Sequence, residues 1–208
     1  MSIQTLDEAS YHRGLTKLAD RDDDLGRILD TLGPPPMWDR PPGFPTLIHI
    51  ILEQQVSLAS ARACLDKLVA VIGELTPAGL LALDDDALKT AGFSRQKSEY
   101  SRVLAAAIER GALDLEGLAY TSDDEARERL MELKGIGRWT ADIYLLMALG
   151  RPDIWPTGDL ALVVAAKQVK NLDTRPSAEE FGRLGDAWRP WRSVAARLLW
   201  HHYLSAER

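Results

Sequence analysis

Helix start and stop signals recur along most of this 208-residue chain. Small polar residues that cap helices precede runs with apolar residues three and four positions apart, and glycines follow these runs. No stretch has the two-residue alternation of a half-buried strand. The sequence therefore predicts an all-α fold. The predicted helix starts are Ser57, Thr76, Asp84, Ser94, Ser122, Asp159 and Ser177, with further helices over 46–54 and after Pro190.

One segment interrupts the helical pattern. Residues 33–45 read GPPPMWDRPPGFP, and we expect no helix there because proline removes a backbone donor and blocks the preceding turn. An ordered crossing between two helical lobes is predicted instead. The predicted lobes are 46–149 and, opposite it, 1–45 together with 150–208. Both belong to one domain, residues 1–208, since this length suits a single core.

Composition excludes several classes of protein. The single cysteine, Cys64, leaves no internal disulfide and no four-cysteine zinc or iron–sulfur site. The net charge of −6 argues against a generally basic nucleic-acid binder, although a local basic face stays possible. The acidic runs in 20–24 and 84–86 are expected to be solvated helix starts. Without a membrane-length apolar run or an apolar leader, we expect a cytoplasmic protein with no membrane association.

The most specific local signal is LKGIGRWTA, residues 133–141. Its glycines permit positive φ and leave room for another backbone to approach. The N–H groups of Gly135, Gly137 and the first turn of the next helix then point outward, which is the arrangement that binds anions. A tight turn between packed helices is the alternative, and it is the commoner meaning of a bare G-x-G.

Four further segments stand in order around this hairpin. They are ILEQQVS at 51–57, GFSRQK at 92–97, WPTGDLAL at 155–162, and WRPWRS at 188–193 followed by Trp200. Together with the hairpin they resemble the motifs of the helix–hairpin–helix/Gly-Pro-Asp DNA glycosylases. The last of these segments, with Trp200, resembles the C-terminal signature of the alkylated-base branch, the 3-methyladenine DNA glycosylase II type. The resemblance implies a two-lobed helical glycosylase fold, without the N-terminal β-rich domain of larger relatives.

Asp159 matches the catalytic aspartate of that family. Breaking an N-glycosidic bond builds up an oxocarbenium-like sugar, and a fixed carboxylate stabilises its positive charge. The same carboxylate can orient or deprotonate the attacking water. A helix N-terminus favours its ionised form. Taken alone, an aspartate at a helix start is usually only a cap, and only the neighbouring motifs favour the catalytic role.

Trp139 and Trp200 match the aromatic walls of the alkyl-base pocket. An indole face attracts the positive charge of an N3- or N7-alkylated purine. Trp139 stands where the lyase branch keeps its Schiff-base lysine, so the resemblance implies a monofunctional enzyme that leaves the strand uncut. We expect Trp188 and Trp191 in the core. For Trp155 the sequence leaves two roles open, a core residue or a residue that narrows the pocket.

Gln55 matches the residue that enters the duplex when the target nucleotide is flipped out. A glutamine capping a kinked helix is the alternative. The resemblance further implies that the hairpin binds DNA phosphate through Lys134, Gly135, Ile136, Gly137, Arg138 and Thr140. In relatives a monovalent cation, Na⁺ or K⁺, often sits among hairpin carbonyls near Lys134 and Ile136. No cofactor is otherwise required, and no iron–sulfur cluster is expected.

Several weaker candidates are expected to be structural. His201 and His202 are adjacent on a helix, face different directions and make a poor metal pair. Cys64 is expected to be a small core residue. Ile143 stands where some relatives place a pocket tyrosine, and Tyr144 lies about 100° further round the helix, so it is no assured substitute.

The resulting hypothesis is a monomeric, monofunctional DNA N-glycosylase that flips out and excises alkylated bases, such as 3-methyladenine, from damaged double-stranded DNA in base excision repair. Three alternatives are weighed against it. A non-catalytic DNA-binding protein would have lost Asp159 or the aromatic walls. A bifunctional glycosylase/lyase would need a lysine in place of Trp139. A helical interaction module leaves the five ordered motifs unexplained.

Overall fold

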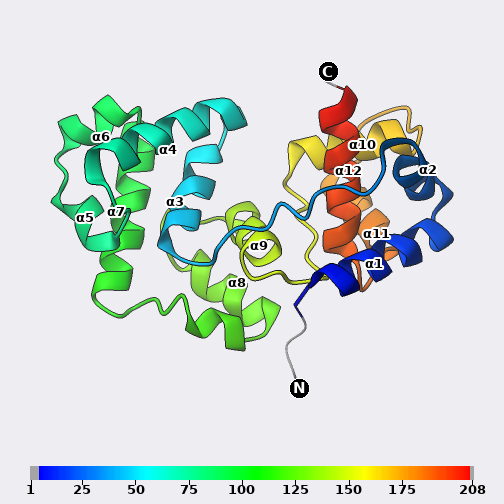
Figure 1. The fold of residues 1–208 in the computed structure, drawn as a ribbon, viewed down its shortest axis with the longest axis horizontal. Helices are drawn as coiled ribbons and strands as arrows, with labels where there is room; N and C mark the ends of the chain where they lie inside the picture. The colour runs from blue at the N-terminus through cyan, green and yellow to red at the C-terminus, as the bar shows by residue number, and fades with distance from the viewer. Residues whose placement is uncertain (1–4, 207–208) are drawn as a thin grey trace. The chain divides into compact units, whose positions relative to one another are not determined.

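The computed structural model describes residues 5–206, and this part of the chain is helical with no strand, which confirms the predicted all-α class (Figure 1). None of its helices is long and apolar enough to cross a membrane. The elements are α1 Glu8–Arg21, α2 Asp23–Leu32, α3 Phe44–Glu53, α4 Leu58–Ile72, α5 Pro77–Ala82, α6 Asp85–Ala91, α7 Arg95–Glu109, the 3-10 helix η1 Gly117–Tyr120, α8 Asp123–Met131, α9 Arg138–Met147, α10 Leu160–Val169, α11 Ala178–Asp186 and α12 Arg192–Ala206.

The chain folds into two compact units. One is Arg40–Tyr144, here named the hairpin unit. The other, the terminal unit, combines the described residues up to Asp39 with those from Leu145 onward. Both boundaries lie a few residues before the predicted ones at 45/46 and 149/150.

Local contacts explain the shifted boundaries. Arg40 is bound to Glu53 of α3 by two hydrogen bonds of 3.0 and 2.7 Å, so the hairpin unit begins before α3. The carbonyl oxygens of Leu145 and Leu146, in the last turn of α9, accept hydrogen bonds from Arg151 and Arg197 of the terminal unit. That last turn therefore belongs with the terminal unit.

Helix α3 forms the centre of the hairpin unit, where it packs on α4 and α7 (Figure 1). A helix that is apolar all round is expected to be buried on every side. Its fully buried side chains are Leu47, Ile48, Ile50, Ile51 and Leu52. The helix begins at Phe44, inside the segment predicted to be non-helical, because Pro45 lies in the first turn, where proline is tolerated.

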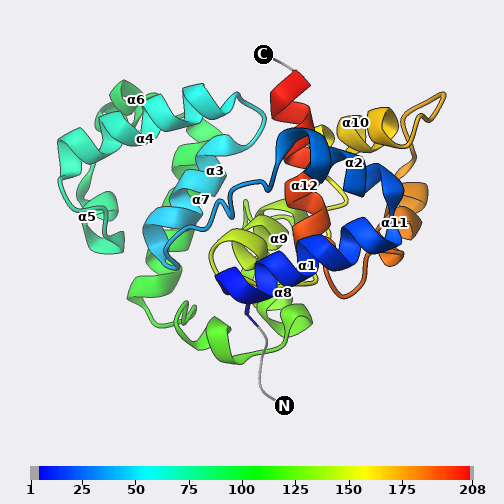
Figure 2. The ribbon, with the colours of Figure 1, turned by 45° about the vertical axis from the view of Figure 1, so that its right-hand side comes forward.

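Helix α12 has the same central place in the terminal unit, where it packs on α1, α2 and α10 (Figure 2). It also holds the proline-rich segment. Its Arg197, 1% exposed, donates to the Met37 carbonyl, and the Tyr11 hydroxyl donates to the Pro35 carbonyl at 2.8 Å. Burial lowers the pKa of Arg197 to about 10 and raises that of Tyr11 to about 12. The segment up to Asp39 is thus an ordered part of this unit.

The predicted helix starts are confirmed by their capping hydrogen bonds. In each case the side chain accepts from a backbone N–H in the first turn, as found for Ser57, Thr76, Asp84, Ser94, Ser122, Asp159 and Ser177. Ser177 and Glu180 also form a reciprocal capping box. The break between α1 and α2 was not predicted from the sequence.

Asp22 makes that break and does more than cap α2. Its Oδ1 accepts from backbone N–H groups of the first turn, while Lys170 Nζ lies 2.5 and 2.7 Å from its two oxygens. Trp188 Nε1 donates to Oδ2 at 2.8 Å. The prediction that this acidic run starts a helix is right, but for Asp22 the prediction of a solvated side chain is wrong. Burial alone would raise the pKa of Asp22, yet the hydrogen bonds and charge of Lys170, with the Trp188 N–H, lower it.

Replacing Asp22 with Asn should destabilise the protein by about 1–3 kcal/mol at neutral pH, since the cap is kept while charged hydrogen bonds are lost. The lowered pKa means that the folded state favours the carboxylate. Its stabilisation is therefore present near pH 7 and is lost as the pH falls below about 4. Urea unfolding of both proteins between pH 7 and pH 3 measures this. Asp30→Asn, at an exposed position of α2, is the control. A pH-independent difference would contradict the ion-pair account.

Candidate functional site

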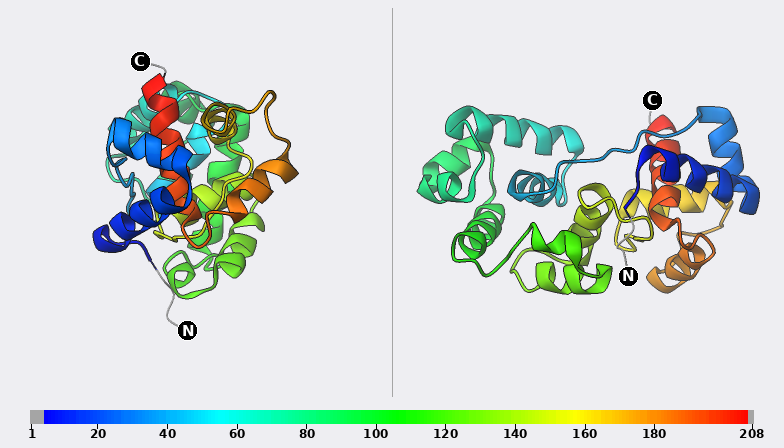
Figure 3. Two further views of the ribbon diagram at one scale, coloured as in Figure 1. Left: turned by 90° about the vertical axis from the view of Figure 1, so that its right-hand side faces the viewer. Right: turned by 60° about the horizontal axis from the view of Figure 1, so that its bottom comes forward.

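Residues 133–141 form the predicted hairpin between α8 and α9. The turn is closed by the Ile136 N–H, which donates to the Leu133 carbonyl at 3.0 Å. The two flanking helices lie side by side (Figure 3), and Arg127 of α8 donates to Asp142 of α9 at 2.6 Å. A buried carboxylate thus ties the second helix of the motif to the first.

The two glycines of the hairpin are needed for different reasons. Gly135 has a φ of +96°, and a Cβ placed there would lie 2.1 Å from the Tyr100 ring of α7. No side chain fits at this position. Gly137 has an ordinary φ, and a Cβ there would meet nothing within 4 Å. The open space at Gly137 is the room that a second backbone needs for close approach.

The start of α9 offers exposed backbone donors. Within residues 5–206, the N–H groups of Gly137 and Arg138 donate to no acceptor, and both residues are exposed. A helix N-terminus with such groups carries partial positive charge. The arrangement fits the predicted phosphate contact at Gly137 and Arg138.

Three other residues of the predicted phosphate site are either buried or already paired within the hairpin unit. Thr140 is 2% exposed and its Oγ1 accepts from Gln54, which leaves its main chain for the predicted phosphate contact. The Ile136 side chain is 4% exposed, which leaves only its main chain for a ligand. Lys134 is exposed and forms an ion pair with Glu99, whose hydrogen bond and charge raise the pKa of the lysine.

Gln55 lies at the exposed turn between α3 and α4, with a φ of +59°. A non-glycine residue in this region is uncommon and is held there by its surroundings. The next residue, Val56, is 44% exposed, and Ser57 caps α4 as predicted. The predicted wedge therefore projects from a defined turn.

Gln54 was not singled out from the sequence, although it belongs to the ILEQQVS motif. Its Nε2 donates to the Gly135 carbonyl and to Thr140 Oγ1, both at 2.9 Å. The residue preceding the predicted wedge is thereby bound directly to the hairpin. Its place beside Gln55, at the end of the apolar run, was the signal available for it.

Asp159 caps α10 in the terminal unit, and it is 8% exposed. Its Oδ1 accepts from the Leu162 N–H at 2.9 Å and from Trp200 Nε1 at 3.2 Å. Two of the predicted site residues, Asp159 and Trp200, are therefore in direct contact. The orientation of the carboxylate is fixed by a backbone N–H at the helix N-terminus and by an indole N–H.

Comparison with known proteins agrees with this arrangement. The family model of the HhH-GPD superfamily base excision DNA repair proteins matches residues 48–190. The chain belongs to this superfamily. Its HhH-GPD match covers the hairpin, Gln55 and Asp159.

Individual HhH-GPD relatives cover nearly the whole chain. The alkylbase DNA glycosidase-like protein mag2 of Schizosaccharomyces pombe is 28% identical over 200 residues, which are 93% of this chain and 94% of mag2. The structure of the S. pombe 3-methyladenine DNA glycosylase Mag1 in complex with abasic DNA has a TM-score of 0.83 at 26% identity, over 90% of this chain and 95% of Mag1. A DNA-3-methyladenine glycosidase from Bacillus halodurans has a TM-score of 0.78 at 29% identity, over 100% and 95% of the two chains.

The remaining tryptophans of this HhH-GPD protein are largely structural. Trp188 is fully buried, as predicted, and Trp191 packs on Gly14 of α1. Trp155 is 4% exposed, stacks against Phe181 and donates to its carbonyl at 2.9 Å, so it belongs to the core. Trp139 is half-buried on α9 of the hairpin unit.

The structure also shows where Tyr144 and Cys64 lie. The Tyr144 hydroxyl accepts from the Gly43 N–H at 2.9 Å, and the ring is fully buried, so it supports the start of α3. Cys64 is partly exposed rather than a core residue, because its α4 position lies at the edge of the packing against Gly92.

The hairpin carbonyls have a pattern that fits a cation. The carbonyl oxygens of Leu133, Gly135 and Gly137 accept hydrogen bonds, whereas those of Lys134 and Ile136 accept none from residues 5–206. Hard cations prefer such oxygen ligands. Elsewhere in the described chain, no cluster of three or more His, Cys, Asp or Glu residues could hold a metal ion.

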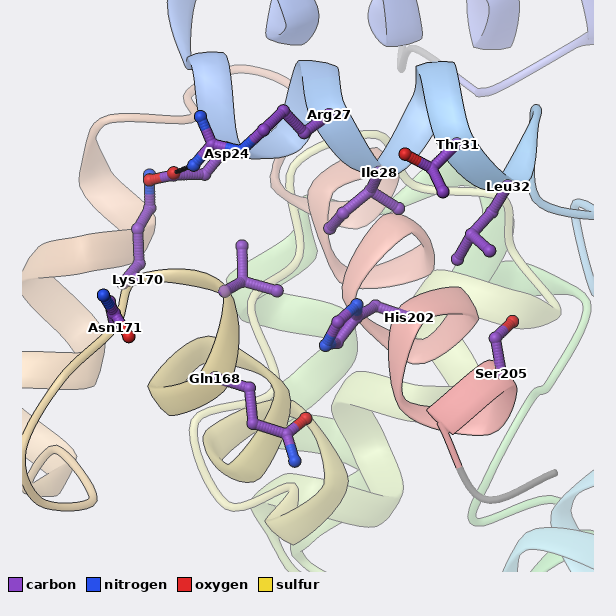
Figure 4. A pocket seen from close by; sticks show the side chains of 11 residues that line it. Asp24, Arg27, Ile28, Thr31, Leu32, Gln168, Lys170, Asn171, His202 and Ser205 are labelled. Carbon is purple, nitrogen blue, oxygen red and sulfur yellow. Dashed lines mark hydrogen bonds and ion pairs between the residues drawn. The ribbon is translucent and has the colours of Figure 1, made fainter.

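A surface pocket of about 730 Å³ lies in the terminal unit among α2, the end of α10 and α12 (Figure 4). Its lining includes none of the predicted site residues. Lys170 and His202 both face it, and Lys170 is bound to Asp22 and Asp24. The pocket is at the C-terminal end of α10, whereas Asp159 is at the other end, about 15 Å along a ten-residue helix. It is therefore separate from the Asp159 site.

Exchanging each hairpin glycine for alanine should separate their roles. Gly135→Ala should lower the free energy of unfolding by about 2 kcal/mol or more, because both the positive φ and the Tyr100 ring oppose a side chain. Gly137→Ala should change it by less than about 0.5 kcal/mol, since the Cβ meets open space. Urea denaturation of both variants measures this, and equal losses of stability would contradict the assignment.

Proposed function

We propose that this protein is a monofunctional DNA N-glycosylase that excises alkylated bases of the 3-methyladenine type from double-stranded DNA and leaves an abasic site. One observation carries the proposal. Asp159, the residue that matches the catalytic aspartate, has a buried carboxylate held through one oxygen by the Leu162 N–H and the Trp200 indole. Membership of a base excision repair family and the names of the relatives support it.

Asp159 supplies the negative charge that the reaction needs. As the N-glycosidic bond breaks, electrons leave with the base, and the sugar gains oxocarbenium character. A carboxylate that is already fixed stabilises this charge without reorganising at the moment of reaction. The same group accepts the proton of the attacking water, and the products are the free base and a hydroxyl on C1′ of an abasic sugar.

Trp200 serves the base as well as the aspartate. Its N–H is directed to Asp159, and we assign the contact with a cationic purine to its indole face. Trp139, on the hairpin unit, keeps its predicted role as a second aromatic contact for the base. A positively charged alkylated base leaves readily, so aromatic recognition and one carboxylate suffice for a selective hydrolase.

Trp139 also accounts for the monofunctional outcome that we propose. An indole cannot form the imine through which a lyase cuts the strand. The lysine nearest to Trp139 in the sequence, Lys134, precedes the hairpin glycines and is paired with Glu99. We therefore assign the strand break after base removal to other enzymes.

The duplex is held by the hairpin and by the turn at Gln55 in this proposal. The exposed N–H groups of Gly137 and Arg138 bind a phosphate oxygen, and Gln55 enters the space left by the flipped nucleotide. The Lys134 and Ile136 carbonyls would hold a Na⁺ or K⁺ ion, which adds positive charge beside the phosphate. The enzyme acts as a monomer, in the cytoplasm, without a further cofactor.

Asp159→Asn should reduce single-turnover release of methylated base by about 10²-fold or more, because the charge is lost while the capping oxygen is kept. Binding to the same duplex should persist. The assay uses purified protein in excess over alkylated duplex DNA and measures free base. Asp173→Asn, an exposed acid of the terminal unit, is the matched control. Near-normal release by Asp159→Asn would remove the catalytic assignment.

A further inference from the structure

We propose that Lys97 is a positioning residue for the Gln55 wedge, acting through the C-terminal turn of α3 rather than by binding DNA. The inference rests on the proposed function, and specifically on the wedge. Lys97 belongs to the GFSRQK segment, for which the resemblance names no role.

The Lys97 ammonium group is directed into the hairpin unit. From α7, its Nζ donates to the carbonyl of Leu52 at 2.6 Å, and the side chain is half-buried. Leu52 is 1% exposed and lies in the last turn of α3. Burial lowers the pKa of Lys97. A lysine that binds phosphate would instead extend its ammonium group into solvent.

The chemistry of a helix end explains why a lysine serves here. The last carbonyls of an α-helix have no partner within the helix, and the C-terminus carries partial negative charge. An ammonium group donates a hydrogen bond to such a carbonyl, and its positive charge is favourable beside the partial negative charge of the helix end. The last turn of α3 is thereby held to α7.

The two residues after Leu52 are held by other segments. Glu53 is bound to Arg40 by hydrogen bonds of 3.0 and 2.7 Å, and Gln54 donates to Gly135 of the hairpin at 2.9 Å. Three successive residues, 52 to 54, are therefore bound to three different parts of the hairpin unit. Gln55 follows at once, with its φ of +59°.

This succession defines where the wedge points. The positive φ of Gln55 persists because the chain before it is fixed and Ser57 caps the helix after it. Loosening the Leu52 carbonyl would free the last turn of α3 and let Gln55 take other conformations. Affinity for an abasic site, where the wedge fills the vacancy, should fall more than affinity for undamaged duplex.

The test is a double-mutant cycle on DNA binding. Wild type, Lys97→Met, Gln55→Ala and the double variant are titrated with a duplex carrying a tetrahydrofuran abasic-site analogue and with undamaged duplex, at several salt concentrations. Lys89→Met, which removes an exposed lysine of α6, is the matched control for charge. Urea unfolding verifies that each variant is folded, and Lys97→Arg tests rescue by a second cationic donor.

The proposal expects Lys97→Met and Gln55→Ala each to weaken abasic-duplex binding by about three- to tenfold, with no further loss in the double variant. The dependence of log affinity on log salt should be unchanged, and Lys97→Arg should recover part of the affinity. Should Lys97→Met fail to fold, Lys97→Gln, whose shorter side chain carries no charge, takes its place in the same cycle with the same expected result.

Two results would overturn the inference while leaving the wedge intact. One is additivity of the two substitutions. The other is equal weakening on both duplexes with a salt slope smaller by about one, which identifies a phosphate contact. If Gln55→Ala itself leaves abasic-duplex binding unchanged, the wedge role in the proposed function falls, and the inference falls with it.

Discussion

The contact between Gly135 and the Tyr100 ring is the constraint on which the hairpin unit depends. Because Gly135 has no side chain, the Tyr100 ring of α7 lies directly against the hairpin backbone. The same approach places Glu99 beside Lys134, and the Gly135 carbonyl accepts from Gln54. The hairpin, α7 and the turn at Gln55 therefore form one connected structure, in which the proposed wedge is held in place before any ligand binds.

In the terminal unit the comparable constraint is the carboxylate of Asp159. A helix cap is an ordinary role for aspartate, and the hydrogen bond from Leu162 fulfils it. The additional donor, Trp200, comes from α12, the central helix of this unit. Cap and catalytic group are thus compatible functions of one side chain. The cap fixes the orientation of the carboxylate, and the reaction that we propose uses its charge.

The sequence was sufficient for the local structure and for the positions of the motifs. Caps such as Ser57 and Ser177 act within three residues, so their signals are readable along the chain. Long-range partners left no such signal. Nothing local relates Asp22 to Trp188, Gly135 to Tyr100 or Lys97 to Leu52, because tertiary packing creates these contacts. The hydrogen bond from Gln54 to the Thr140 hydroxyl is of the same kind, since Gln54 belongs to a distant part of the sequence.

The central claim is that the protein hydrolyses the bond to an alkylated base and goes no further. The most direct measurement incubates the wild-type protein with methylated duplex DNA and analyses released base and strand length, with and without alkali after the enzyme step. The account predicts free methylated base and strands that break only after alkali. Strand breaks without alkali would contradict the monofunctional assignment, and no released base from folded, DNA-bound protein would contradict the alkyl-base glycosylase itself.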